Sequence, residues 1–235
     1  MFRALFQQLS DQLPSRCEIC HAWPTDVVCE SCVHRFAQPC QRCLSCAVLT
    51  PLGQSQCGAC LRSAPPLDRC LAAVSYGFPW SGLIVDFKFQ SRPGLATLFS
   101  QLLRSTPWVE PALESADFLL PMPLSKQRLQ QRGFNQALVL ARQLAFDKTA
   151  ANVLLRIRDT PAQSQLLRPE RSRNVADAFA VDPLTRNELK NKRVILVDDV
   201  MTSGASLYSA AKALRQAGAI HITALVVART DFSPE

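Results

Sequence analysis

The stretch Val194-Ile195-Leu196-Val197-Asp198-Asp199-Val200-Met201-Thr202-Ser203-Gly204-Ala205-Ser206 decides the fold of this chain. Its first four residues are apolar and mostly β-branched, which predicts a short buried strand over 193–197. Two adjacent carboxylates follow at the point where we expect that strand to end. A run of small residues with one glycine then leads into 207–216, which has the pattern of a helix. The order strand, tight loop, helix is the repeating unit of an α/β domain.

The loop of this unit has the composition of a phosphate cradle. The free N–H groups at a helix N-terminus and the helix dipole favour an anion there. Asp198 and Asp199 repel a phosphate, so they suit a neutral group beside it, such as the 2- and 3-hydroxyls of a ribose. An ordinary strand end with a Ser/Thr helix cap is the alternative, but it leaves the acidic pair unexplained. The small, mostly hydroxylated loop residues are Thr202, Ser203, Gly204, Ala205 and Ser206.

Strands alternate with helices through the rest of the C-terminal region. We expect further strands over 70–78, 117–120, 153–158 and 222–228, and helices from 80, over 95–103 and over 135–145. A basic stretch at 124–136 has no clear periodicity, and 163–179 is expected to be a polar loop leading to a short helix. This alternation predicts a mostly parallel sheet flanked by helices. Ligands of such sheets bind at the carboxyl ends of the strands, where Asp198 and Asp199 fall.

Residues 14–62 carry four CxxC pairs. Each pair can offer two thiolates to one ion, and two pairs complete the tetrahedral four-thiolate site of structural zinc. This segment has few aliphatic residues and cannot fold on a core of its own. We therefore expect two zinc ions in a small domain, 1–66, with an N-terminal helix and a double zinc ribbon, followed by a larger domain, 67–235. The pairs are Cys17–Cys20, Cys29–Cys32, Cys40–Cys43 and Cys57–Cys60.

Spacing leaves the pairing of these cysteines open. We favour neighbouring pairs, with Cys17, Cys20, Cys29 and Cys32 at one site and Cys40, Cys43, Cys57 and Cys60 at the other. An interleaved pairing is the alternative, and Cys46 can replace Cys40 because Cys43-x2-Cys46 is also a CxxC. A redox role would need a thioredoxin-like βαβ context, which the surrounding sequence lacks. Residues 1–13 have the spacing of an amphipathic helix rather than of a signal peptide, which disfavours disulfides.

Positive charge is concentrated in one segment of the chain. The 235 residues carry a formal net charge of +7, and 121–175 holds ten Lys/Arg against three acids, which accounts for all of it. A polyanionic ligand or a nucleic acid is the natural partner of such a segment, whereas an exposed solubilising face is the plainer interpretation. No apolar run approaches the ~20 residues that a membrane span needs.

The acidic pair and the loop after it resemble the PRPP-binding signature of type I phosphoribosyltransferases, although the common form of that loop carries threonines. Together with the double zinc ribbon, the helix with Lys88, Arg132-Gly133-Phe134-Asn135-Gln136 and the 163–179 segment, they make the chain similar to the ComF family, including its GntX-like members. The resemblance implies a type I phosphoribosyltransferase-like domain and a role in natural competence and the use of external DNA. It also implies action in the cytoplasm, at the inner face of the membrane, where incoming single-stranded DNA emerges.

The resemblance also suggests roles for individual residues. The loop would hold the 5-phosphate, and Asp198 and Asp199 would be the catalytic pair that binds the ribose. The pyrophosphate would need Mg²⁺, which binds through few carboxylates and keeps waters. If pentosyl transfer occurs, catalysis would depend on positioning and electrostatics, with an acceptor that the sequence does not identify. The candidate cations for the pyrophosphate are Lys88, Lys126, Arg128, Arg132 and Arg171.

A second hypothesis from the same residues is a non-catalytic adaptor. The zinc ribbons and the basic segment would bind single-stranded DNA through its phosphates, with Phe134 or Trp80 stacking on bases. A third is that the ribbons bind a protein of the DNA-uptake machinery. The first two differ in their salt dependence and in their sensitivity to loss of Asp198 and Asp199.

Overall fold

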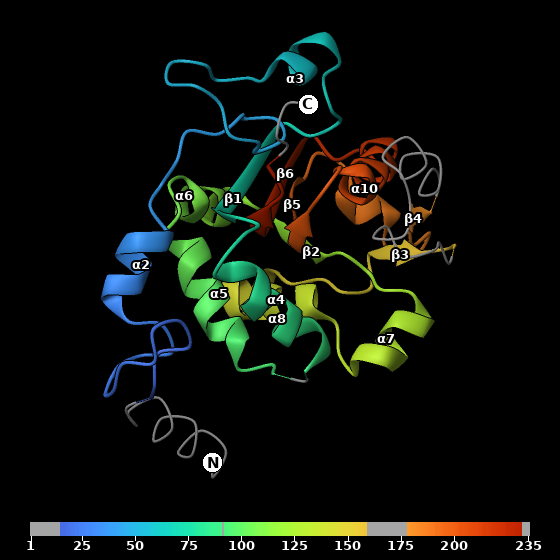
Figure 1. Cartoon of the computed structure of the whole chain (residues 1–235). Helices are drawn as coiled ribbons and strands as arrows, with labels where there is room; N and C mark the ends of the chain where they lie inside the picture. The colour runs from blue at the N-terminus through green and yellow to red at the C-terminus, as the bar shows by residue number, and fades with distance from the viewer. Residues whose placement is uncertain (1–14, 91, 159–177, 232–235) are drawn as a thin grey trace. The chain divides into compact units, whose positions relative to one another are not determined.

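The computed structural model describes residues 15–90, 92–158 and 178–231, and the statements below concern those residues. The chain divides into two compact units, Met1–Gln38 and Pro39–Glu235. The cysteines at 43–60 therefore belong to the same unit as the sheet. Figure 1 labels the helices and strands along the chain. The division after residue 66 remains a prediction.

A parallel sheet of four strands, in the order β1-β6-β5-β2, forms the centre of the larger unit. Its strands are β1 (Arg69–Ser75), β2 (Phe118–Pro121), β5 (Arg193–Met201) and β6 (His221–Arg229). Leu225 of β6 lies in register between Leu71 of β1 and Val197 of β5. Every residue of β6 after His221 is buried, as expected for a parallel strand covered on both faces. The predicted mostly parallel α/β fold is confirmed.

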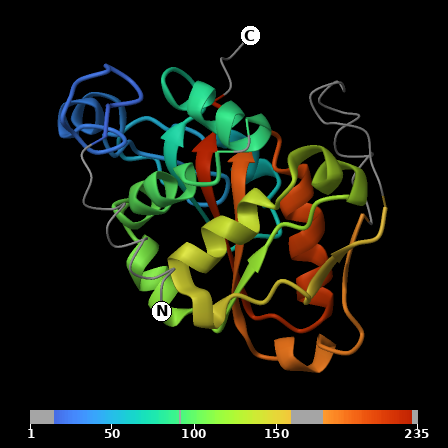
Figure 2. The ribbon, with the colours of Figure 1, turned by 90° about the horizontal axis from the view of Figure 1, so that it is seen from below.

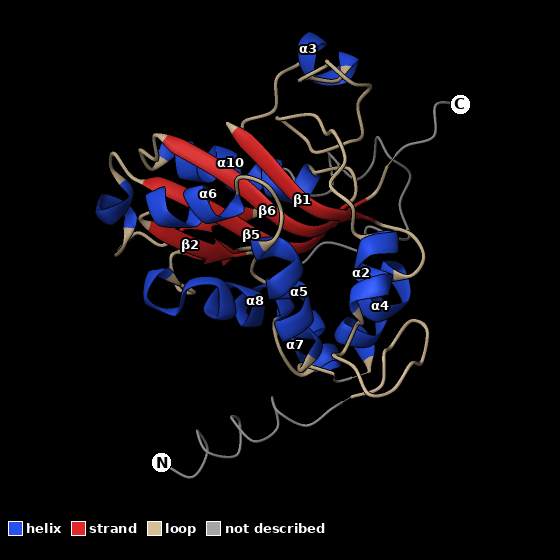
Figure 3. Ribbon diagram, turned by 90° about the vertical axis from the view of Figure 1, so that its left-hand side faces the viewer, coloured by secondary structure: helices blue, strands red, loops and turns tan. Residues whose placement is uncertain are grey.

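Helices cover both faces of this sheet. One face carries α5 (Leu95–Arg104), α6 (Val109–Ser115) and α8 (Gln136–Ala145), with α4 (Trp80–Phe89) packed on α5. The other face carries α10 (Ala205–Gln216), which also packs on β4 (Phe179–Val181). Figure 2 shows α8 lying across the strands, and Figure 3 shows α5 and α8 together on one side of the sheet. The long run of apolar residues in each strand is thus buried between two helical layers.

Some elements differ from the expectation. β5 continues through both aspartates to Met201, because its pairing with β6 extends to Arg229. β4 pairs antiparallel with β3 (Leu154–Arg156) as a separate two-stranded sheet. After residue 66, two short α-helices were not predicted, α6 and α7 (Lys126–Arg132). The segment 163–177, with Arg171, and the N-terminal helix lie outside the described residues.

The basic stretch 124–136 forms a helix because its ends are capped. Ser125 accepts a hydrogen bond from the backbone N–H of Arg128 at 3.3 Å, and Gly133 ends the helix with φ 76°. No residue of α7 is buried, so no apolar period marked it in the sequence. Short connecting helices complete the described structure: α2 (Glu30–Phe36), α3 (Gly58–Arg62) and two 3-10 turns, 146–148 and 186–189. Among all these helices, none has the length and apolar character needed to cross a bilayer.

Candidate functional site

The acidic pair lies near the carboxyl end of β5, facing the end of α4. The Lys88 ammonium is 2.8 Å from the Asp199 carboxylate, and the two side chains are only 18% and 8% exposed. Asp198 accepts a hydrogen bond from the backbone N–H of Asp199 at 2.9 Å. Lys88 is also near enough to Asp198 to lower the pKa of that carboxyl. The structure thus brings together Lys88, Asp198 and Asp199 from elements that are more than a hundred residues apart in sequence.

Asp198 is held in an environment that opposes its charge. Burial raises the pKa of Asp198 to about 7, with the neighbouring Asp199 adding to the rise, whereas Lys88 and Arg132 oppose it. The Asp198 carboxyl is therefore partly protonated near neutral pH in the absence of ligand. Such a carboxyl can donate to or accept from a sugar hydroxyl, and it gains full charge when a cation comes near.

The loop after β5 is closely packed on its inner side. Gly204 has φ 81°, and a Cβ at this position would lie 2.5 Å from Met201 Cε and 2.6 Å from Tyr208 Cζ. Only glycine fits this turn, because the positive φ disfavours other residues and a Cβ would overlap the neighbouring side chains. The turn delivers the chain into α10 at Ala205, two residues earlier than predicted, and the Ala205 N–H lies 3.4 Å from the Ser203 hydroxyl. The 12-residue helix α10 thus begins four residues after Met201, the last residue of β5.

Of the predicted cations on α7, one is near the acidic pair. The Arg132 guanidinium is close enough to Asp198 to lower the pKa of that carboxyl. It donates a hydrogen bond to Gln136 Oε1 at 3.1 Å, and its Cζ lies 5.2 Å from the centroid of the Phe89 ring. Lys126 has an exposed side chain, and Arg128 is half-buried on the same helix. Phe134 packs edge-to-face on Phe87 of α4, with ring centroids 5.6 Å apart.

Two groups of four cysteines have their sulfurs gathered to within 4.8 Å of one another. They are Cys17, Cys20, Cys29 and Cys32, and Cys43, Cys46, Cys57 and Cys60. Tetrahedral Zn–S bonds of about 2.3 Å place ligand sulfurs about 3.8 Å apart. The Cys20–Cys29 and Cys46–Cys57 sulfurs are 3.6 and 3.7 Å apart, so both clusters fit zinc. The pairing of neighbouring CxxC units is confirmed for the first cluster.

In the second cluster, the prediction of Cys40 as a ligand is wrong, and Cys46 takes its place. The chain makes its tight turn after Cys43, where the Ala47 N–H donates to the Cys43 carbonyl at 2.8 Å, and this turn brings Cys46 back beside Cys43. Cys40 precedes the turn and is exposed. Either CxxC satisfied the spacing, so only the position of the turn decided between them.

Backbone N–H groups favour the thiolate form of one cysteine in each cluster. Burial opposes ionisation of Cys17, but N–H groups of Cys20, Cys29 and Ile19 lower its pKa to about 6. In the same way, N–H groups of Cys57, Ser45 and Cys46 lower the pKa of Cys43 to about 7 against burial. A thiolate is the form that binds a metal ion.

Arg229, which the sequence analysis did not single out, joins the second cluster to the loop after β5. Its side chain is only 2% exposed, and its Nε donates to the Cys46 carbonyl at 2.7 Å. Its Nη1 donates to the Met201 carbonyl at 3.1 Å and also to the Thr202 carbonyl. An arginine at the end of a predicted strand gave no signal in the sequence, because its partners are backbone carbonyls of distant segments.

Other contacts hold the second cluster against the sheet. The Leu44 carbonyl accepts from the Cys70 N–H at 2.7 Å, which covers the free edge of β1. Arg42 donates to the Ala47 carbonyl at 3.0 Å and pairs with Asp231 at 3.4 Å. Cys70 is 3% exposed and lies outside both clusters.

Comparison with known proteins identifies the class of this fold. Residues 129–231 match the family described as "Phosphoribosyl transferase domain". This segment contains the acidic pair, the loop and α10, and the mixed α/β architecture around a parallel sheet agrees with it.

Similarity to individual proteins identifies the family of this chain within that class. "Competence protein F" of Haemophilus influenzae is 34% identical over 181 residues, covering 74% of this chain and 78% of that protein. "DNA utilization protein YhgH" of Salmonella typhimurium is 28% identical over 214 residues, covering 86% and 90%. "Competence protein ComFC" of Bacillus subtilis is 37% identical over 102 residues, covering 43% and 39%. The chain belongs to the ComF family of competence proteins.

Proposed function

We propose that this chain binds PRPP or a related ribose phosphate at the carboxyl end of β5. The observation that carries the proposal is the buried ion pair between Lys88 and Asp199. The adjacent carboxyl, Asp198, has its pKa raised to about 7. A buried, paired and partly protonated acid cluster at the carboxyl edge of a parallel sheet is typical of a ligand site rather than of a structural contact. The match to the phosphoribosyl transferase domain family supports the same ligand class.

In this proposal each group has one task. Asp198 and Asp199 bind the ribose hydroxyls, and the residues Thr202–Ser206 with the amino end of α10 bind the 5-phosphate. Lys88 and Arg132 stand where the pyrophosphate would extend from the ribose. Mg²⁺ would bind between the pyrophosphate and one or two carboxylates, as this ion does in phosphate sites. Lys126, Arg128 and Arg171 remain candidates for the outer part of the pyrophosphate.

Ligand-induced thermal stabilisation tests the proposal. PRPP with Mg²⁺ at a hundredfold excess over its Kd should stabilise the chain by about 2.7 kcal/mol, which raises the melting temperature by several degrees. Asp198→Ala and Asp199→Ala should each abolish the shift. Asp147→Ala is the matched control, because Asp147 is an exposed aspartate on the 3-10 turn after α8. No shift with the unmodified chain, or a shift that survives both aspartate changes, would rule out this site.

The names of the relatives support a role for this chain in the use of external DNA. They are competence and DNA utilization proteins, and we propose that this chain acts in the same process, on the cytoplasmic side of the membrane. Transfer of the ribosyl group to an acceptor is the reaction that the site would support. Loss of pyrophosphate would leave a cationic sugar, which the two carboxylates would stabilise.

A second candidate function, single-stranded DNA binding, is favoured by α7. This helix carries Lys126, Arg128 and Arg132 without a single acid and has no buried residue. Lys126 is exposed, Arg128 and Arg132 are half-buried, and the Arg132 guanidinium lies over the half-exposed ring of Phe89. Cations beside an aromatic ring are typical of surfaces that track a single strand.

Salt dependence separates the two functions. Binding of a labelled oligothymidylate should weaken with salt at a slope of about −0.7 for each phosphate neutralised, and the Lys126→Gln/Arg128→Gln double variant should make the slope shallower by about 1.4. Asp199→Ala should leave oligonucleotide binding intact while it abolishes the PRPP shift. Oligonucleotide affinity that is independent of salt would exclude this surface.

A further inference from the structure

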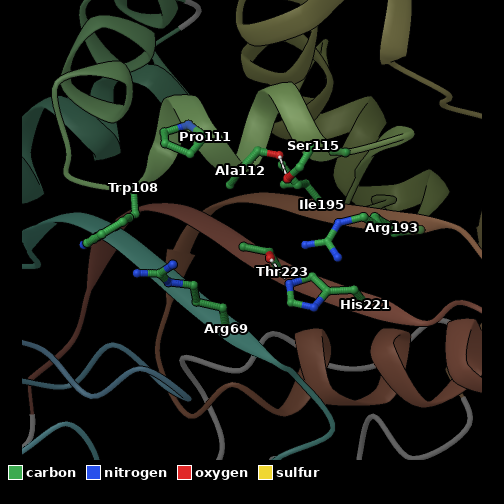
Figure 4. Close-up of a pocket in the computed structure, with 11 residues that line it drawn as sticks. Arg69, Trp108, Pro111, Ala112, Ser115, Arg193, Ile195, His221 and Thr223 are labelled. Carbon is green, nitrogen blue, oxygen red and sulfur yellow. Dashed lines mark hydrogen bonds between the residues drawn. The ribbon is translucent and has the colours of Figure 1, made fainter.

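A cavity of about 240 Å³ lies at the opposite end of the sheet from the acidic pair. Its floor is formed by the first residues of β1, β5 and β6, and its roof is formed by α6 (Figure 4). The charged and aromatic side chains in its wall are Arg69, Trp108, Arg193 and His221. This volume is just below the roughly 300 Å³ at which pockets for drug-sized ligands begin, so the cavity suits a small ligand or part of one.

Strand register places two arginines on one face of the sheet. Arg69 of β1 pairs with Thr223 of β6, which in turn pairs with Ile195 of β5. Arg193 pairs with His221, two residues before Ile195 and Thr223, so its side chain projects to the same face. Figure 4 shows the Arg193 guanidinium directed toward Thr223 and the Arg69 guanidinium beside Trp108.

Neither guanidinium has a carboxylate partner among the described residues. Arg69 Nε is buried without a hydrogen-bond acceptor, although its guanidinium lies 5.1 Å from the centroid of the Trp108 ring. Nearby acids are already used: Asp68 pairs with Arg215, and Asp117 pairs with Lys192 at 2.9 Å. A buried donor left without an acceptor costs stability, so an acceptor supplied by a ligand would compensate for it.

The rest of the wall is aromatic and weakly polar. Trp108 is 62% exposed, so its ring has free surface on which a planar group can stack. Burial lowers the pKa of His221 against the opposing charge of Asp68, and Arg193 lowers it further, so this imidazole is neutral at pH 7. Thr223 and Ser115 contribute hydroxyls to the same wall.

We propose that this cavity binds a mononucleotide, with its phosphate between Arg69 and Arg193 and its base on Trp108. Two guanidiniums on one face of the sheet can each donate to the oxygens of a phosphate. The exposed indole supplies the stacking surface that a base needs, and the hydroxyls can meet a sugar. The volume admits one nucleotide rather than a longer chain.

This site is independent of the proposed ribose phosphate site. Arg193 and Asp198 are five residues apart on one strand, which is about 17 Å at about 3.3 Å per residue. One small ligand cannot fill both sites. The failure of either proposal therefore leaves the other standing.

Calorimetric titration of the full chain with AMP, ribose 5-phosphate, adenosine and inorganic phosphate tests the proposal. We expect AMP to bind most tightly, and Arg69→Gln and Arg193→Gln each to weaken it at least tenfold. Trp108→Ala should weaken AMP at least fivefold and leave ribose 5-phosphate unchanged. Arg142→Gln, on α8 and outside the cavity, is the matched control and should have no effect.

Two further variants separate this site from the acidic pair. The Asp198→Ala/Asp199→Ala variant should keep its AMP affinity, and Arg193→Gln should keep its PRPP response. Melting curves verify that each variant is folded, and Arg69→Lys, which keeps the charge, should recover part of the affinity lost in Arg69→Gln. The proposal is overturned if AMP does not bind, if its binding survives both arginine changes, if it is lost with the two aspartates, or if phosphate alone binds as well as AMP.

Discussion

The two cysteine clusters have the same chemistry and different surroundings. The first lies within the small unit, and its Cys20 is exposed. The second lies within the larger unit, where Cys43, Cys46 and Cys60 belong to the same buried apolar cluster as α10 and the sheet. Two identical sets of four thiolates can therefore have different structural roles. The first stabilises a small module, and the second is part of the hydrophobic core of a domain.

The second cluster also reaches the candidate site. Arg229 connects the Cys46 carbonyl with the carbonyls of Met201 and Thr202, immediately before the glycine turn into α10. A metal that fixes the Cys43–Cys46 turn therefore fixes the loop that we propose to bind phosphate. The predictions below test whether the two clusters differ in this way, in order of decreasing effect.

Loss of a ligand in the second cluster should have the largest effect. Structural zinc contributes about 10–16 kcal/mol in small metal domains, which is comparable with the whole stability of a domain, about 5–15 kcal/mol. Cys46→Ser should therefore abolish cooperative unfolding of the larger unit, measured by circular dichroism. Cys17→Ser should lower the main transition by no more than about 2 °C. Equal losses in both variants would show that the two clusters do not differ.

Arg229→Lys should loosen the loop without removing the metal. A lysine keeps the charge but lacks the planar fork that reaches several carbonyls at once. We expect PRPP affinity to fall about 10- to 100-fold, about 1.4–2.7 kcal/mol, with two zinc ions per chain retained by elemental analysis. Arg215→Lys is the matched control, because Arg215 also donates to a backbone carbonyl, that of Ala219, and pairs with Asp68, but it lies at the far end of α10. Unchanged affinity in Arg229→Lys would disconnect the cluster from the loop.

Asp198→Asn should stabilise the ligand-free protein while it removes ligand binding. The native pKa of about 7 lies above the ordinary value of 3.8, so the native state binds more protons than the unfolded state between these two values. The stability of the unmodified chain should therefore fall as the pH rises from about 4 to 7, whereas the variant lacks this loss. At pH 8 the variant should be more stable by on the order of 1–3 kcal/mol, and near pH 4 the two should be equal. Urea unfolding across this pH range measures the difference.

Cys40→Ser should have the smallest effect. Cys40 is exposed and lies outside the second cluster. Zinc content should stay at two per chain, and the melting temperature should change by less than about 2 °C. A loss of one zinc would restore Cys40 as a ligand in place of Cys46.

Much of the fold followed from local patterns in the sequence. The buried strands carry continuous apolar runs, the helices on either side of the sheet carry apolar residues at helical spacing, and Asn135 and Gly218 mark helix ends. The acidic pair and the loop after it were recognisable because their residue types are adjacent in sequence. The helices α6 and α7 were missed because each has only seven residues, of which α6 buries two, Val109 and Leu113, and α7 buries none.

The sequence by itself determined the α/β class, the position of the acidic pair and the presence of two four-cysteine sites, because each depends on neighbouring residues or on fixed spacing. Only the tertiary structure decided that Cys46 replaces Cys40, that Lys88 pairs with Asp199, that Arg229 joins a cysteine turn to the loop, and that Arg69 and Arg193 share one face of the sheet. These relations join residues separated by long stretches of chain, or depend on where a turn closes. Strand register and packing create them, and neither is encoded in the local order of residues.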